Sequence, residues 1–244
     1  LFRSEEEEPV YDLKYPWELL EANVKQTTKS TENISESNGL VPENIHSTAS
    51  LGDKIILGDN VQIGKNVMIK GKAIIGDNTI LSDGVIVEEN VQIGSNCHIS
   101  GYAKISKGTT IGNHCKIGFT AEIFGVFFEG VSAVHQTQFY GIAGKSVDIA
   151  AGVNVGSLRF DDQATTHKIN GKRMVGNYSN GAFIGDYTRL GINNVLFPGV
   201  KIGSNCAIGP GAIIERDVPN QTLVQVQQEK TYSEWGPNRY GWND

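Results

Sequence analysis

Aliphatic residues recur at every sixth position along two long stretches of the chain, and Gly often follows them. Because six is a multiple of the strand period of two but not of the helical 3.6, the pattern predicts extended segments broken by regular turns. The first stretch consists of Ile45, Leu51, Leu57, Ile63, Ile69, Ile75, Leu81, Val87, Ile93, Ile99, Ile105, Ile111, Ile117 and Ile123. The second consists of Ile184, Leu190, Leu196, Ile202, Ile208 and Ile214.

Three such six-residue strands make one triangular coil, and coils stacked about 4.8 Å apart bring every one of these aliphatic side chains into a central column. We therefore expect an all-β chain whose residues 41–217 form a parallel β-helix. Cys97, Cys115 and Cys206 each sit two positions before an aliphatic residue, where Ala, Val or Thr stands elsewhere. They are expected to fill the core, and a disulfide framework or a zinc site is not indicated.

Four segments fall outside the repeat. Residues 1–40 are expected to hold a short helix from Pro16 to about Lys25 and then a polar linker. Two insertions are expected to interrupt the coils, at 124–141 and 157–181. Residues 218–244 are expected to form a short strand and an aromatic tail that caps the open end of the β-helix.

The two predicted insertions carry the candidate chemistry. Less than one coil separates them, so we expect their side chains to meet. His135 in the first insertion is the candidate general base, because histidine titrates near neutrality; a structural role in the loop is the alternative. The second insertion is basic and predicts a phosphate pocket, with solubility of an exposed loop as the alternative. Its cations are Arg159, Lys168, Lys172 and Arg173.

Composition narrows the function further. The net charge is -6 and the pI is about 5.4, which argues against non-specific nucleic-acid binding. No apolar run is long enough to span a membrane, and no secretory leader opens the sequence. With three unpaired cysteines in addition, we expect a cytoplasmic protein.

The motifs from Ala151 onward resemble the acetyltransferase half of archaeal-type bifunctional sugar-1-phosphate nucleotidylyltransferases. That half is a left-handed β-helix of hexapeptide repeats in this family. The resemblance rests on AGVNVG at 151–156, LRFDD at 158–162, KINGKR at 168–173, GAFIGD at 181–186 and PGVKIG at 198–203. The segment YPWELLEAN at 15–23 is similar to the end of the nucleotidylyltransferase domain in the same proteins.

This resemblance implies a homotrimer with its active site between subunits. The implied reaction moves an acetyl group from acetyl-CoA to the amino or hydroxyl group of a phosphorylated or nucleotide-linked sugar, such as glucosamine 1-phosphate. It assigns His135 as the base, Asn154 as the residue that orients the acceptor, Tyr140 as a substrate contact and the four cations as the phosphate pocket. Backbone around Ser157, Gly191, Asn194 and Gly209 would bind coenzyme A and supply oxyanion donors; no metal is implied.

Two other functions stay open. The chain could be a non-catalytic β-helix scaffold or regulatory subunit of a separate nucleotidylyltransferase, because His135 and Asn154 are nineteen residues apart, further than the resemblance leads us to expect. A zinc hydrase on the same fold ranks last, since no pair of histidines has the close spacing that such a site needs.

Overall fold

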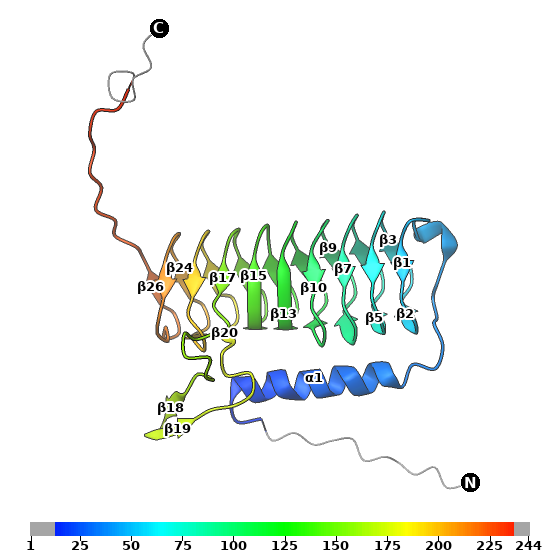
Figure 1. Ribbon diagram of the computed structural model, residues 1–244, viewed down its shortest axis with the longest axis horizontal. Helices are drawn as coiled ribbons and strands as arrows, with labels where there is room; N and C mark the ends of the chain where they lie inside the picture. Colours follow the sequence, from blue (N-terminus) through cyan, green and yellow to red (C-terminus); the bar gives the residue numbers. More distant parts are fainter. Residues whose placement is uncertain (1–12, 237–244) are drawn as a thin grey trace.

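The computed structural model describes residues 13–236, most of which form one long stack of coils (Figure 1). Leu57 pairs with Ile75 and Ile75 with Ile93, so neighbouring coils are offset by eighteen residues and their strands run parallel. The aliphatic series points inward and forms one continuous buried core. The predicted parallel β-helix is confirmed, and the three cysteines are buried free thiols inside it.

Each coil has three faces. The strands of the first face are β2 (Ile55–Leu57), β5 (Ala73–Ile75), β8 (Val91–Ile93), β11 (Thr110–Ile111), β20 (Ala182–Ile184) and β23 (Lys201–Ile202). Those of the second face are β3 (Gln62–Ile63), β6 (Ile80–Leu81), β9 (His98–Ile99), β12 (Lys116–Ile117), β14 (Ser132–Ala133), β16 (Asp148–Ile149), β21 (Arg189–Leu190), β24 (Ala207–Ile208) and β26 (Leu223–Val224). Those of the third face are β1 (Ser50–Leu51), β4 (Met68–Ile69), β7 (Ile86–Val87), β10 (Lys104–Ile105), β17 (Asn154–Val155), β22 (Val195–Leu196) and β25 (Ile213–Ile214).

Two consecutive coils are shorter than the rest. Strands β13 (Glu122–Phe127) and β15 (Gln138–Ala143) run directly from the third face into the first, without the corner that joins these faces elsewhere. Ile123 pairs with Phe139, a step of sixteen residues instead of eighteen. The predicted insertion at 124–141 is therefore wrong. Residues 124–141 belong to the coils, and the register changes because only four positions separate Ile123 from the next inward residue, Phe127.

Glycine makes this straight passage possible. Gly125 and Gly141 pair with each other in β13 and β15, with φ of 127° and 147°. A Cβ atom on Gly125 would overlap the carbonyl oxygen of Gly141, and one on Gly141 would overlap that of Ala182. At these φ values a side chain would therefore overlap the neighbouring coil, so both positions require glycine.

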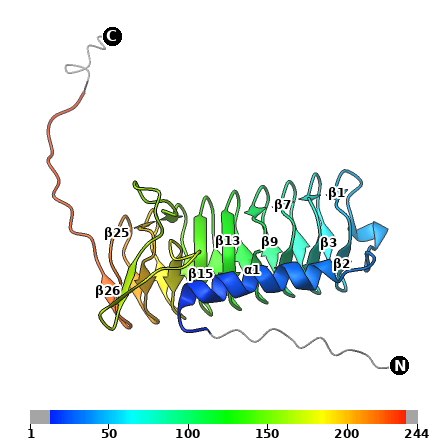
Figure 2. The same ribbon diagram turned by 60° about the horizontal axis from the view of Figure 1, so that its bottom comes forward.

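Helix α1 (Pro16–Glu32) lies lengthwise along the coils, as Figures 1 and 2 show, and covers the two shorter coils of β13 and β15. Val126, Ile142 and Phe183 point outward from β13, β15 and β20 and form a second buried cluster with Trp17 and Leu20 of the helix. These strands are therefore apolar on both sides, which is why their sequence lacks the alternation of the other coils.

The second half of α1 occupies residues that we expected to form a linker. There Thr31 donates to Asn90 Oδ1 of a coil (2.8 Å). Just before this half, Asn23 donates to the carbonyl of Gly108 (2.8 Å) and accepts from Thr110 (2.6 Å). Tertiary hydrogen bonds keep this Thr-rich segment helical despite its weak helix propensity. The short 3-10 helix η1 (Pro42–Asn44) then leads into the first coil.

After Val155 the chain leaves the coils and returns at Ala182. This excursion carries an antiparallel hairpin of β18 (His167–Ile169) and β19 (Lys172–Met174), which projects beyond the first turn of α1 (Figure 1). Asn170 and Gly171 form its turn with φ of 48° and 77°, the conformation of a type I′ hairpin.

The tail after β26 does not cover the open end of the β-helix. Residues 225–236 run away from the last coil (Figure 1), with Tyr232 and Trp235 exposed, while Ile214 and Val224 line an open pocket at that end. The predicted aromatic cap is thus wrong for the part of the tail that is described. Tyr240 and Trp242 lie outside the described residues. Between residues 13 and 236 no helix has the length and apolar character to cross a membrane.

Candidate functional site

A row of outward side chains crosses the third face beside the point where the chain leaves the coils. Lys104, Glu122, Gln138, Asn154 and Val195 occupy equivalent positions on five successive coils. Lys104 Nζ lies 2.8 Å from a carboxylate oxygen of Glu122, whose charge and hydrogen bond raise the pKa of the lysine. The row therefore passes from an ion pair through two carboxamides to an apolar residue.

Asn154 is exposed in this row. Its Nδ2 donates to the carbonyl of Gly152 (2.8 Å), which orients the carboxamide and leaves its oxygen as a possible acceptor for a ligand group. Gln138 lies directly beside it on β15. Two neutral carboxamides on a flat face suit the hydroxyl and amino groups of a sugar better than they suit a metal ion.

A pocket of about 270 Å³ lies at the edge of the third face next to this row. Predicted residues Tyr140 and Ser157 line it together with Glu122, Gln138 and Phe124. The Tyr140 ring stacks on Phe124, with 4.9 Å between centroids. Burial, and secondarily the neighbouring Tyr178, raise the pKa of Tyr140 to about 12, so the phenol remains a hydrogen-bond donor at neutral pH.

His135 lies at the opposite edge of the same face. It is exposed at the corner between the second and third faces, where its carbonyl accepts from Gly152 N (3.1 Å). Tyr140 follows five positions later, beyond the turn at Gln136 and on the far side of the third face, which limits their Cα separation to about 16 Å. His135 is not among the residues that line the Tyr140 pocket.

The corner of His135 also carries the predicted coenzyme A residues Gly191 and Gly209, two and three coils further along, roughly 10 and 14 Å away. Their amides donate to Ile208 O (2.8 Å) and Val224 O (2.7 Å), so these two groups are not available as oxyanion donors. The Asn194 side chain is buried inside the coil and donates to Gly209 O (2.7 Å). The prediction that the amides of Gly191 and Gly209 serve as oxyanion donors is therefore wrong, and coenzyme A binding at this corner stays a prediction.

The hairpin divides its cations between two faces. Lys168 and Arg173 lie opposite each other across β18 and β19, while Lys172 lies opposite Ile169. Since cross-strand partners share a face, Lys168 and Arg173 project together, on the side away from Ile169, which packs against the helix cluster. All three cationic side chains belong to exposed residues.

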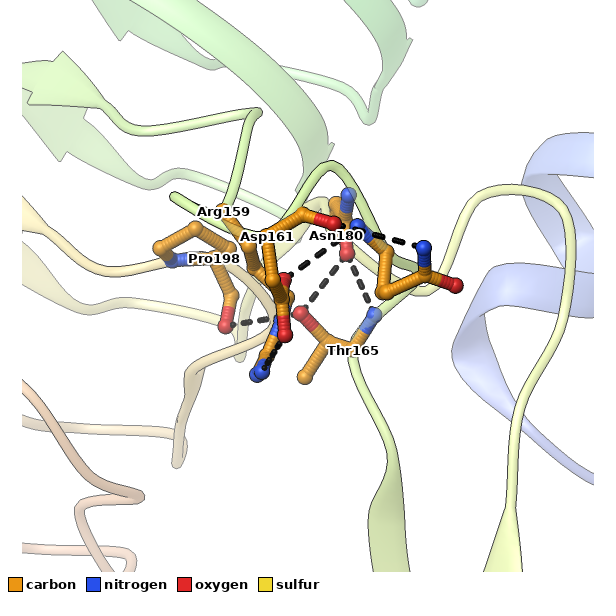
Figure 3. A network of polar contacts seen from close by, with 6 residues as sticks. Arg159, Asp161, Thr165, Asn180 and Pro198 are labelled. Carbon is orange, nitrogen blue, oxygen red and sulfur yellow. Dashed lines mark hydrogen bonds and ion pairs between the residues drawn. The ribbon is translucent and has the colours of Figure 1, made fainter.

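Arg159 belongs to a different part of the excursion (Figure 3). Its guanidinium binds both carboxylate oxygens of Asp161 (2.9 and 2.7 Å), and this contact lowers the pKa of Asp161 to about 2. Nearby, Asn180 accepts from Thr165 Oγ1 (2.7 Å) and donates to Ser157 O (3.1 Å), which ties the excursion to its own start.

Beside Arg159 lies a pocket of about 530 Å³ with largely apolar walls, formed by the excursion and the last two coils; its lining does not include the hairpin cations. The residues that line it are Gly156, Leu158, Arg159, Phe160, Asp161, Val195, Leu196, Phe197, Pro198 and Glu215.

Within one chain the predicted residues thus fall into two groups. His135, Gly191 and Gly209 share one corner, whereas Tyr140, Ser157 and the excursion lie at the opposite edge, with Asn154 on the face between them. The expectation that His135 and the basic loop meet is wrong within the single chain, because His135 sits in a regular corner and not on an insertion. In residues 13–236 no group of three or more His, Cys, Asp or Glu side chains could hold a metal ion.

Sequence comparison identifies the repeat. Residues 54–89, 90–125 and 181–216 match the family described as bacterial transferase hexapeptide (six repeats). The chain is 39% identical over 107 residues to the bifunctional sugar-1-phosphate nucleotidylyltransferase/acetyltransferase of Sulfurisphaera tokodaii, covering 42% of this chain and 26% of that protein. It is 34% identical over 115 residues to the bifunctional protein GlmU of Methanococcus maripaludis, covering 46% and 28%. The uncharacterized acetyltransferase YaiX of Escherichia coli is 34% identical over 124 residues, covering 50% and 54%.

Solved structures agree on the fold. LpxA from Acinetobacter baumannii superposes with a TM-score of 0.51 at 22% identity, covering 74% of this chain and 70% of that one. The UDP-N-acetylglucosamine acyltransferase from Campylobacter jejuni gives 0.51 at 19% identity, covering 73% and 70%. The predicted left-handed parallel β-helix is confirmed. The chain spans about a quarter of the bifunctional relatives and about half of YaiX.

Proposed function

We propose that this chain, whose coils are hexapeptide repeats of the bacterial transferase type, is an acyltransferase that acts on a sugar. The reaction moves an acetyl group from acetyl-CoA to an amino or hydroxyl group of a phosphorylated or nucleotide-linked sugar. The observation that carries the proposal is the position of His135: an exposed histidine on the edge of a face whose centre holds Asn154 and Gln138.

His135 would act as the general base. The imidazole takes the proton from the acceptor nitrogen or oxygen as that atom attacks the thioester carbonyl of acetyl-CoA. The C–S bond then breaks, and the imidazolium returns the proton to the departing thiolate of coenzyme A. Asn154 would accept a hydrogen bond from the acceptor through its carboxamide oxygen. The pantetheine arm of acetyl-CoA would lie along this corner, where Ile192 is exposed between the two glycines.

A second copy of the chain would complete the site. His135 and the hairpin cations lie at opposite edges of one chain, so the phosphate pocket next to His135 would come from the hairpin of a neighbour in a homotrimer. The exposed apolar side chains of Leu158, Phe160 and Phe197 support such an assembly, because a contiguous apolar patch is commonly an interface.

The test is a thiol-release assay with acetyl-CoA and a panel of amino sugars and their 1-phosphates. His135→Asn should lower kcat about a hundredfold, since a carboxamide cannot take up the proton. His114→Asn is the matched control: His114 is likewise an exposed corner histidine, but it follows the first face instead of the second. Equal turnover in the two variants would remove His135 from the mechanism.

The non-catalytic alternative makes a different prediction in a simpler measurement. A scaffold that only keeps the fold would show no heat of binding with millimolar acetyl-CoA and no thiol release with any sugar of the panel. Light scattering of the same sample checks the trimer, and a monomer with full activity would contradict the shared site.

A further inference from the structure

His167 is a buried histidine at the base of the hairpin, where three parts of the molecule meet. It begins β18 and is only 5% exposed. Its ring stacks on the indole of Trp17 from α1, with 4.3 Å between centroids and 18° between planes. The edge of Phe183 from β20 closes another side. The ring therefore joins the hairpin to both the helix and the coils, beside the contacts of Ile169 and Met174 with the helix cluster.

The hydrogen bonds of His167 define its protonation state. Nε2 lies 2.9 Å from the carbonyl oxygen of Ser179, and Nδ1 lies 2.9 Å from Nζ of Lys201. A carbonyl only accepts and an ammonium only donates, so the ring must be neutral, with its hydrogen on Nε2 and a lone pair on Nδ1. Lys201 in turn lies 2.9 Å from a carboxylate oxygen of Asp217.

The backbone is shaped to admit this ring. Gly199 has φ of 82°, and a Cβ atom there would lie 2.9 Å from Cε1 of His167. The ring therefore packs directly against a glycine backbone at the corner that precedes Lys201. The next residue of the hairpin is Lys168, so the position of His167 sets where the cationic face of Lys168 and Arg173 stands.

We propose that His167 is a positioning residue: its neutral ring pins the cationic hairpin to Trp17 and Lys201, and protonation of the ring releases the hairpin. The part of this proposal that concerns substrate rests on the proposed function, in which Lys168 and Arg173 bind the acceptor phosphate. The pinning and its release do not depend on that function.

The charges around the ring favour the neutral form. Burial lowers the pKa of His167, and so does the charge of Lys201, while the Ser179 carbonyl and Asp217 act in the opposite direction. The other neighbours, Trp17 on α1 and Phe183 on β20, carry no charge. A proton on Nδ1 would also place two cations 2.9 Å apart without a shared acceptor.

The consequence for stability follows from linkage. Because the pKa is lower in the folded protein, the unfolded chain takes up the proton first as the pH falls. The contribution of His167 to the free energy of unfolding is complete above about pH 6.5 and declines as the pH drops from there through the folded-state pKa.

The first experiment uses Trp17 as the reporter. In a Trp235→Phe, Trp242→Phe background Trp17 is the only tryptophan of the chain. Release takes the ring off the indole, which is only 3% exposed, and admits water to it, so we expect the Trp17 emission to move to longer wavelength with a midpoint below pH 6.5. His167→Gln in this background keeps a donor toward Ser179 but cannot titrate, and its emission should stay flat over the same range.

Hydrogen exchange tests the release itself. Amides of residues 167–174 should exchange faster at pH 5 than at pH 8, after correction for intrinsic rates, while those of β8 and β11 should not change. The same comparison in His167→Gln should give no pH-dependent difference. A flat Trp17 titration, or hairpin protection that is independent of pH in the parent protein, would overturn the proposal.

A kinetic experiment tests the link to substrate. His167→Gln should raise KM for a phosphorylated acceptor about tenfold, because it loses the Lys201 bond and the ring stack, and leave KM for acetyl-CoA unchanged. His98→Gln is the matched control on the second face, away from the hairpin. Equal effects on both substrates would contradict the positioning role. If the protein transferred no acetyl group at all, the fluorescence and exchange results would still decide the pinning.

Discussion

Trp17→Ala is expected to detach the first half of α1 while the coils stay folded. Trp17 is only 3% exposed and packs in the cluster of Leu20, Val126, Ile142 and Phe183. Truncating a buried Trp costs about 3 to 5 kcal/mol. A helix of this length is marginal on its own, so docking supplies most of its stability. The opening equilibrium of this segment should therefore rise by roughly a hundredfold to a few thousandfold.

The second half of the helix should respond less. Thr31 keeps its hydrogen bond to Asn90, which lies on another coil. We expect hydrogen exchange to accelerate in residues 17–23 and, through the lost stack on His167, in the hairpin at 167–174. Amides of the aliphatic column should keep their protection.

A control on the same helix and two contradicting exchange patterns complete the test. Lys25→Ala removes an exposed ion pair with Glu21 (2.8 Å) on the same helix and should change exchange by less than a factor of about five. If Trp17→Ala instead accelerated exchange evenly through the coils, the helix and the β-helix would be one cooperative unit. If it left residues 17–23 unchanged, the cluster would not be what holds the helix.

Two further predictions concern the hairpin and the two shorter coils. The double variant Lys168→Met, Arg173→Met should raise KM for a phosphorylated acceptor at least about tenfold without changing KM for acetyl-CoA. Lys172→Met, on the other face of the hairpin, should have a smaller effect; equal KM values in the two variants would contradict a shared cationic face. Gly125→Ala should lower the free energy of unfolding by about 2 kcal/mol or more in urea denaturation, because backbone strain and overlap with the next coil add. Gly171→Ala is the control, since Gly171 also has positive φ but open space around it, and it should cost only about 1 kcal/mol. A similar loss of unfolding free energy in the two variants would mean that the neighbouring coil shifts to accommodate the new methyl group.

The six-residue period was sufficient to predict the β-helix, because each inward aliphatic residue can be buried only by that winding. It misled at residues 124–141, where the apolar run was interpreted as an insertion. A signal was present: Gly125 and Gly141 are sixteen residues apart, as are Ala133 and Ile149. A search restricted to multiples of six passes over that shorter repeat.

The candidate site was less predictable for a different reason. His135 and the basic residues could be selected by chemical type, but their separation depends on which corner of the coil each one occupies. That placement depends on the two missing positions in each shortened coil. His167 had no distinguishing sequence signal, since its neighbours Trp17 and Lys201 are 150 and 34 residues away along the chain. The second half of α1 was not predicted, because Thr31 bonds to Asn90, a residue of the coils that lies far away along the chain.

The apolar cluster that holds α1 on the coils has a consequence for biosynthesis. The helix leaves the ribosome before the coils, but Phe183, which completes the apolar cluster beneath it, follows about 165 residues after Trp17. At roughly 5 to 20 residues per second, Trp17 and Leu20 wait on the order of ten to thirty seconds before their final partner emerges. The nascent chain therefore exposes the apolar side of α1 throughout translation of the coils, so a chaperone that binds short apolar segments should associate with it until Phe183 has been made.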